Sequence, residues 1–131
     1  MKLVQGKPPI YNKLIEAGLK PNERTVFTFG DTLFIQDLQE KDIDQFLLAH
    51  EKVHQRQQKN PNDWWNRYIS DPKFRFEQEL EAYREQYIFF KANMRTKYHK
   101  DFLFRIARDL SSPIYGCGIS YIEAENLIRK V

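Results

Sequence analysis

The chain has 131 residues, of which 30% are charged and 41% are hydrophobic, and its formal net charge is +3. These values are typical of a soluble protein, and the length suits one domain, residues 1–131, with one core. No apolar run is long enough to span a bilayer, and the amino terminus lacks the apolar segment of a signal peptide. The single cysteine, Cys117, excludes an intramolecular disulfide. We therefore expect a cytoplasmic protein that does not contact membranes.

The first third of the chain predicts two small elements. Two prolines, a short apolar stretch and a closing glycine predict a short helix over residues 8–18. Residues 24–35 are rich in β-branched and aromatic side chains around a Gly30-Asp31 turn, which predicts a β-hairpin. We expect this hairpin to be the only sheet. Because two strands alone are marginally stable in water, it should lie against the helices that follow.

The rest of the chain is predicted to be mainly helical. A capping pair at Asp42 begins a first long helix that ends near residue 58, and Asp71-Pro72 begins a second that runs to about residue 98. Residues 59–71 are predicted to be a loop with one short helical turn, in which Trp64 and Trp65 either anchor the loop or line a substrate pocket. An apolar segment follows at 102–110, and after a break at 111–113 a last helix begins at a capping box from Ser120 to Glu123. The predicted fold class is α+β, mainly α with a small hairpin.

The first long helix contains His50-Glu51-Lys52-Val53-His54, an H-E-x-x-H segment. At this spacing the two imidazoles lie one turn apart on one face of the helix, with a carboxylate beside them. Two imidazoles can reach one zinc ion at about 2.0 to 2.1 Å, but a protein zinc site normally has a third protein ligand before water completes the tetrahedron. A third ligand must therefore come from elsewhere in the chain.

The second long helix offers four glutamates as that ligand, and helical geometry separates them. Relative to the apolar stripe of this helix, Glu79 falls about 60° from the centre, whereas Glu77, Glu81 and Glu85 fall roughly 100° to 180° away. Only Glu79 is expected to border the core. His99 is a rival, but in a continuous helix it would lie about 30 Å from Glu79.

These residues resemble the gluzincin metallopeptidases, in which H-E-x-x-H on one helix is joined by a glutamate from a later helix, commonly within E-x-x-A-D. Here the second half reads Glu79-Leu80-Glu81-Ala82-Tyr83. The resemblance covers about residues 24–90. It implies a minimal zincin-like core with the metal ligands on the two long helices.

The resemblance also implies a role for each matching residue. His50, His54 and Glu79 would bind Zn2+, and Glu51 would be the general base that takes a proton from a zinc-activated water. The reaction would be hydrolysis of a peptide or protein substrate. Tyr83 stands where such peptidases often place an aspartate.

Tyr83 is the departure from the family pattern, and three roles remain open for it. Its hydroxyl could accept a hydrogen bond from an imidazole, could donate one to an oxyanion during hydrolysis, or could belong to an ordinary core tyrosine. The hairpin is similarly open. Its edge could bind a peptide by strand addition, with Phe27, Phe29 or Phe34 shaping side-chain pockets, or it could be plain core structure.

Four other interpretations remain for the site and its surroundings. The histidines could be core side chains without a metal, or the metal could be a noncatalytic structural or regulatory clamp, since so short a chain has little spare sequence for a deep cleft. A third is a basic interaction module over residues 91–100, although these scattered cations favour a solvated face and no nucleic acid is expected. In the fourth, Cys117 or Tyr115 from a glycine-flanked segment enters the site and makes the enzyme latent, or Tyr115 donates to an oxyanion.

Overall fold

The computed structural model describes residues 1–116 and 118–130. The chain is mainly helical with one small sheet, which confirms the predicted fold class. None of the helices over the described residues is both long and apolar enough to span a bilayer. The elements, in chain order, are β1 (Lys2–Gln5), α1 (Tyr11–Glu16), β2 (Phe27–Phe29), β3 (Thr32–Ile35), the 3-10 turn η1 (Glu40–Asp42), α2 (Gln45–Gln57), α3 (Pro61–Ser70), α4 (Pro72–Asn93), the 3-10 turn η2 (Thr96–Tyr98), α5 (His99–Leu110) and α6 (Tyr121–Arg129).

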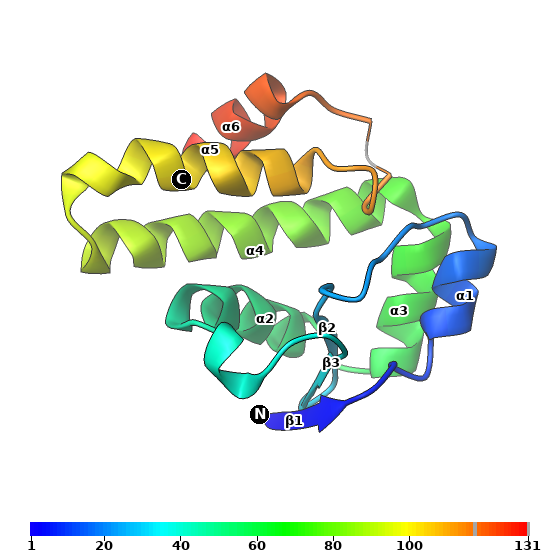
Figure 1. The fold of residues 1–131 in the computed structure, drawn as a ribbon. Helices are drawn as coiled ribbons and strands as arrows, with labels where there is room; N and C mark the ends of the chain where they lie inside the picture. The colour runs from blue at the N-terminus through cyan, green and yellow to red at the C-terminus, as the bar shows by residue number, and fades with distance from the viewer. Residues whose placement is uncertain (117, 131) are drawn as a thin grey trace.

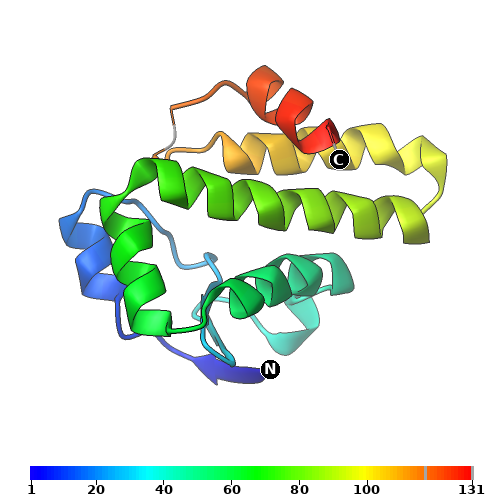
Figure 2. The same cartoon turned by 180° about the vertical axis from the view of Figure 1, so that it is seen from behind.

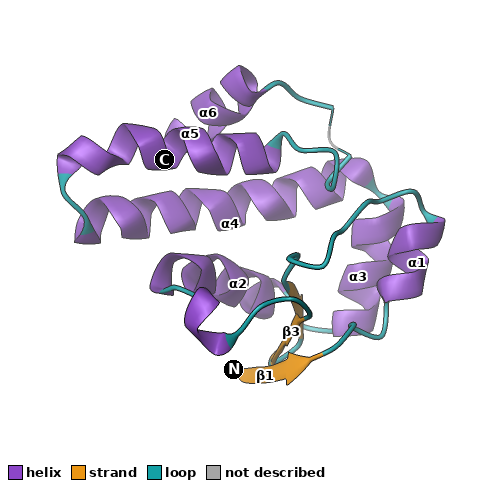
Figure 3. Cartoon of the chain, viewed as in Figure 1, coloured by secondary structure: helices purple, strands orange, loops and turns teal. Residues whose placement is uncertain are grey.

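Helix α4 lies at the centre of the fold. Helices α5 and α6 cover one side of it, and α2 and the sheet lie on the other side (Figures 1 and 2). Helices α1 and α3 lie side by side at the end where α4 begins (Figure 3). This arrangement places α2 and the first half of α4 next to each other, and they are the two elements predicted to carry the metal ligands.

The sheet has three strands in the order β1-β3-β2, so the prediction of a hairpin as the only sheet is incomplete. Strands β2 and β3 form the predicted antiparallel hairpin, with Gly30 in a left-handed conformation (φ 60°) in the turn. Strand β1 joins β3 in parallel. All four residues of β1 are exposed, so no alternation of buried and exposed side chains signalled this strand.

Helices α2 and α4 begin and end close to the predicted positions, with two differences. The N-cap of α2 is Asp44, whose Oδ1 accepts hydrogen bonds from the backbone N–H groups of Phe46 and Leu47. Asp42, the predicted start, belongs instead to η1. Helix α4 begins after Asp71 as predicted but ends at Asn93 rather than near residue 98. The backbone of Met94 is extended there (φ −123°, ψ 154°), and a 3-10 turn leads directly into α5.

The predicted loop over residues 59–71 is wrong, because residues 61–70 form α3. Pro61 is at the first helical position, where its missing N–H group costs nothing, and the side chain of Asn60 caps the helix by accepting from the backbone N–H of Asp63. Trp64 and Tyr68 are four residues apart and buried on one face. The proline is thus the start of a helix and not a break.

Two clusters of buried side chains lie on either side of α4. We call the first the C-terminal core, formed by α4, α5 and α6, and the second the aromatic core, formed by α1, α3 and the sheet with the loop before it. The C-terminal core consists of Tyr83, Tyr87, Phe90, Phe102, Leu103, Ile106, Ala107, Leu110, Ala124 and Ile128. The aromatic core consists of Ile10, Leu14, Leu19, Phe27, Trp64, Trp65 and Tyr68.

Candidate metal centre

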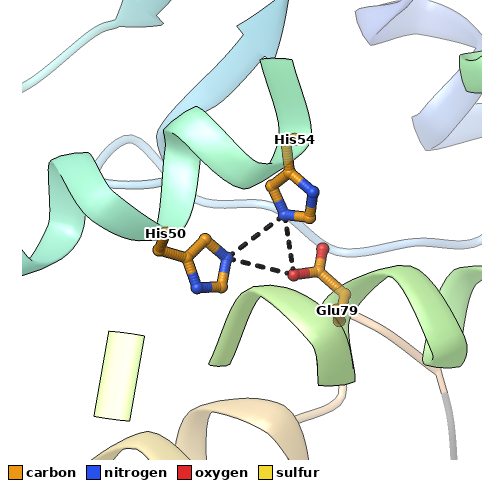
Figure 4. Close-up of side chains that lie close together, drawn as sticks. All are labelled: His50, His54 and Glu79. Carbon is orange, nitrogen blue, oxygen red and sulfur yellow. Dashed lines mark hydrogen bonds and ion pairs between the residues drawn. The ribbon is translucent and has the colours of Figure 1, made fainter. Parts of the chain in front are cut away.

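Two imidazoles and a carboxylate meet between α2 and α4. His50 and His54 come from consecutive turns of α2, and Glu79 reaches them from α4 (Figure 4). Nε2 of His50 lies 3.2 Å from Nε2 of His54 and 3.2 Å from Oε1 of Glu79, and Nε2 of His54 lies 3.0 Å from the same oxygen. All three side chains are buried. The group could therefore hold a metal ion.

A glutamine holds the outer nitrogen of each imidazole. Nδ1 of His54 lies 2.8 Å from Oε1 of Gln57, whose amide orientation is fixed because its Nε2 donates to two oxygens of α4. Nδ1 of His50 lies 3.1 Å from Oε1 of Gln86. An amide oxygen only accepts, so the hydrogen-bond network assigns the proton of each neutral ring to Nδ1 and a lone pair to Nε2.

The inner atoms of the triad are therefore three acceptors that face one another. Such an arrangement is repulsive unless a metal ion or a proton lies among them. In a tetrahedral site with zinc bonds of 2.0 to 2.1 Å, two ligand atoms are about 3.3 Å apart. The observed separations of 3.0 to 3.2 Å are close to this value. Two imidazoles with one carboxylate are also a ligand set of catalytic zinc sites, so these residues fit zinc.

Charge interactions within the triad are strong because its members are buried. Burial favours the neutral imidazole of His54, but the Glu79 carboxylate outweighs this and raises the pKa of His54 to about 9. Burial also opposes ionisation of Glu79, yet His54 and His50 hold its pKa well below the usual range. A proton and a metal ion therefore compete for His54.

Glu79 is oriented by a tyrosine from the aromatic core. The hydroxyl of Tyr68 donates a hydrogen bond of 2.5 Å to Oε2 of Glu79, which leaves Oε1 directed at the imidazoles. Burial and then the neighbouring carboxylate raise the pKa of Tyr68, so this hydroxyl stays protonated as a donor. Helix α3 thereby fixes the third ligand, through a residue that no metal motif contains.

Glu51 lies beside the triad and not in it. Its Oε1 accepts a hydrogen bond of 3.0 Å from the hydroxyl of Thr28 on β2, and its Oε2 is 3.8 Å from Nε2 of His50. Burial is the largest cause that raises the pKa of Glu51 above its ordinary value. The carboxylate is thus held next to the group of His50, His54 and Glu79, with a raised affinity for a proton.

Tyr83 lies against His50, and its hydroxyl pairs with that of Tyr115. The Tyr83 and His50 rings are 4.4 Å apart between centroids at an interplanar angle of 65°, and the two phenol oxygens are 2.7 Å apart. Of the roles left open for Tyr83, acceptance of a hydrogen bond from an imidazole N–H is filled by Gln86 at His50. The guanidinium of Arg75 donates to the carbonyl of Tyr115 and so fixes the carboxy-terminal segment over the site.

Two spaces adjoin the centre. A small cavity of about 50 Å³, large enough for water, adjoins His54 and Glu79 and is lined by Trp64, Trp65 and Tyr68 of the aromatic core. A larger, open groove of about 630 Å³ adjoins His50. Residues that line both spaces include His50, Glu51 and Tyr115. The chain, although short, does have room for a substrate beside Glu51.

The structure brings together the three predicted ligands and separates their rivals. Glu79 is buried as predicted, whereas Glu77, Glu81 and Glu85 are exposed. The helix does break before His99, but this ring packs against Phe90 and its Nε2 contacts the carbonyl of Met94. His99 is therefore not a ligand of this centre.

The aromatic side chains that were open to two interpretations lie mainly in the aromatic core. Trp64 and Trp65 are buried in α3 and hold neighbouring elements through their ring N–H groups, and both also line the small cavity. Phe27 is buried and lines that cavity, while Phe29 and Phe34 pack against the aromatic core. Cys117, predicted as a possible latency ligand, lies outside the described residues.

Sequence reasoning missed the residues that orient the site, namely Thr28, Gln57, Tyr68 and Gln86. Two of these had a usable signal. Gln57 is three residues after His54, and Gln86 is seven residues after Glu79, so each shares a helix face with a ligand. Thr28 and Tyr68 reach the site only through the packing of β2 and α3, which no local pattern encodes.

Comparison with known proteins gives the chain no relatives. No protein-family model matches it, and no curated protein and no solved structure matches it either. The assignment of function therefore depends on the geometry of the centre.

Proposed function

We propose that the protein is a zinc-dependent peptidase in which Glu51 is the general base. The observation that carries this proposal is the position of the Glu51 carboxylate: buried, hydrogen-bonded to Thr28, beside the His50, His54 and Glu79 group, and on the wall of an open groove. A structural metal clamp needs no such carboxylate. A groove that ends at a base is what hydrolysis of a bound chain requires.

The chemistry divides between the ion and the chain. A zinc ion bound by the triad would supply an acidic water and a Lewis acid for a peptide carbonyl. Glu51 takes the proton of the attacking water, for which its raised pKa suits it, and returns that proton to the leaving amine. Thr28 keeps one carboxylate oxygen of Glu51 in place, so the other is the oxygen that exchanges the proton.

The hydroxyl pair of Tyr83 and Tyr115 belongs to the same proposal. Both tyrosines line the groove next to His50, and their hydroxyls are 2.7 Å apart. One hydroxyl can donate to the other and leave a proton for the developing oxyanion of a substrate. A catalytic role of Tyr83 stays a prediction.

The second candidate is a noncatalytic metal clamp. It is favoured by the burial of all three ligands between α2 and α4, because an ion there would fasten the two helices together. Both candidates expect about one zinc ion per chain by elemental analysis. They differ in whether Glu51 matters.

The first test identifies the ligands. Glu79→Ala should lower zinc affinity more than 100-fold, which exceeds the 10- to 100-fold typical of an outer hydrogen-bond partner. Glu81→Ala, two residues away on the exposed face of α4, is the control and should stay near the wild-type affinity. Competition with a chromogenic chelator measures both. Equal losses in the two variants would assign the third ligand elsewhere.

The second test separates a peptidase from a clamp. Glu51→Gln should reduce hydrolysis of an unfolded protein such as casein by about 10²- to 10⁴-fold, the usual contribution of a general base, with unchanged zinc content. Glu77→Gln is the same change at an exposed position of α4 and should leave the rate unchanged. Hydrolysis that survives in Glu51→Gln would show that Glu51 is not the base, and absence of hydrolysis by zinc-loaded wild-type protein would favour the clamp.

A further inference from the structure

The open groove beside His50 carries opposite charges on different walls. Its cationic residues, Lys20 and Arg24, belong to the loop between α1 and β2, and its acidic residues include Asp42 of η1 and Asp109 of α5. His50 is also on the lining. A chain bound across the site would therefore pass between side chains of opposite charge.

The loop that carries Lys20 and Arg24 is ordered by its own hydrogen bonds, and these two side chains form no ion pairs among the described residues. Asn22 and Thr25 bond to each other through side chain and backbone, and the Asn22 carboxamide accepts from the backbone N–H of Arg24 at 2.8 Å. Neither Lys20 nor Arg24 makes an ion pair with any residue that the structure describes. The loop is held by its backbone, and the two cations remain available to a ligand.

Asp109 is the uncommitted acid of the other wall. The carboxylate of Asp42 accepts a hydrogen bond from the backbone N–H of Gln39, whereas the carboxylate of Asp109 makes no hydrogen bond or ion pair over the described ranges. Asp109 is also in the last turn of α5, where a negative charge opposes the helix dipole. A carboxylate at this position destabilises the helix, and its nearest charged neighbours are Arg105 and Arg108 of the same helix.

We infer that the groove selects peptide segments that carry an acidic side chain on one side of the cleaved bond and a basic side chain on the other. The acidic side chain would face Lys20 and Arg24, and the basic one would face Asp109. This inference rests on the proposed peptidase function and names its substrate class. It predicts that peptides with one order of charges are preferred over the same peptides with the order reversed.

The experiment uses three 12-residue peptides, each with one central Ala-Phe bond. The first has two aspartates before the bond and two lysines after it, the second has the lysines before and the aspartates after, and the third has serines at all four positions. Wild-type zinc-loaded protein should cleave one charged order about tenfold faster in kcat/KM than the other, as expected from three partly exposed ion pairs. The faster order also reveals the direction in which the chain lies. Equal rates for all three peptides would overturn the inference.

Charge exchange within the groove gives the decisive variant. Lys20→Glu with Arg24→Glu and Asp109→Lys should invert the preference between the two charged orders. Lys97→Glu with Lys100→Glu and Asp101→Lys changes the net charge equally at exposed positions outside the groove and should keep the wild-type preference. A preference that the groove variant leaves unchanged would overturn the inference.

Two further measurements separate charge selectivity from misfolding and from cleavage. Single variants, Arg24→Gln and Asp109→Asn, guard against loss of folding in the triple variant, and each should reduce the preference about threefold. Fluorescence anisotropy of labelled peptides on Glu51→Gln protein, with and without zinc, measures binding apart from cleavage. Charge-selective binding without cleavage by wild-type protein would refute the peptidase function but support the charge selectivity of the groove. Cleavage without charge preference would support the peptidase function but refute the charge selectivity.

Discussion

The two buried cores differ in what their side chains contact. In the C-terminal core, rings and aliphatic groups contact one another, as where Phe90 stacks on Phe102 with centroids 3.8 Å apart. In the aromatic core, Trp64, Trp65 and Tyr68 all donate a hydrogen bond away from the cluster. Apart from Tyr83, which lies against His50, the first core stabilises the fold, whereas the second also positions the candidate metal centre.

The polar atoms of the aromatic core are linked to the centre either by one hydrogen bond or by two in series. The Tyr68 hydroxyl holds Glu79 directly. The ring N–H of Trp65 donates to the carbonyl of Thr28, and the Thr28 hydroxyl holds Glu51. Because each ring is wedged among its neighbours, the donors have fixed positions. Burial of a large amphipathic ring is thus a way to place a hydrogen-bond donor accurately.

A cavity in the C-terminal core should produce the largest change in stability and none in metal binding. Ile128 on α6 is fully buried, so Ile128→Ala should lower the free energy of unfolding by about 2 to 5 kcal/mol. Ile122→Ala, the same change on the same helix at a side chain that is 57% exposed, should stay within about 0.5 kcal/mol. Urea unfolding followed by circular dichroism measures both.

The zinc affinity of folded Ile128→Ala protein should equal that of wild type. A loss of affinity as large as that of a site variant would show that the two cores are energetically coupled, and the division between them would be wrong.

Removal of one hydroxyl oxygen from the aromatic core should weaken zinc binding more than it changes stability. Tyr68→Phe keeps the ring but frees the Glu79 carboxylate, so zinc affinity should fall about 10- to 100-fold. Tyr11→Phe is the matched control, because the Tyr11 ring packs against the same core and its hydroxyl makes no hydrogen bond among the described residues. Chelator competition measures affinity. An unchanged affinity in Tyr68→Phe would mean that packing alone orients Glu79.

The difference between the cores also explains what could be predicted from the sequence. Helical periodicity placed His50, His54 and Glu79 on buried faces, since each position depends only on its own helix. The pairing of β1 and the hydrogen bonds from Thr28 and Tyr68 depend on tertiary packing between elements. Local patterns therefore predicted the three candidate ligands but not the side chains that orient them.

The same reason accounts for the misread segment at residues 59–71. Pro61 follows Asn60 and precedes two tryptophans, a pattern that suits a loop anchored by large rings. It suits a helix equally, with Asn60 as N-cap and proline in the first turn, and the choice depends on whether a partner surface is available. The hairpin and α1 provide that surface, through the contacts of Phe27 with Trp65 and with Tyr11.

The smallest predicted effect concerns pH and comes from the His54–Glu79 pair. In the metal-free protein the pKa of His54 is raised from 6.5 to about 9, so its contribution to stability is complete below pH 6.5 and is lost as pH rises through 9. The pKa of Glu79 is lowered, so its contribution is present above about pH 4.5 and is lost as pH falls further. The pair thus contributes most between about pH 4.5 and 6.5.

Metal-free wild-type protein should accordingly lose about 1 kcal/mol of unfolding free energy between pH 6.5 and 8 that His54→Gln does not lose. His99→Gln, which changes a histidine outside the centre, should follow the wild-type curve. Zinc affinity should change in the opposite direction and rise up to about pH 9, because binding displaces the proton from His54. If stability and zinc affinity both fell as the pH rose, the proton and the metal ion would not be sharing one position, and the triad would have to be reassigned.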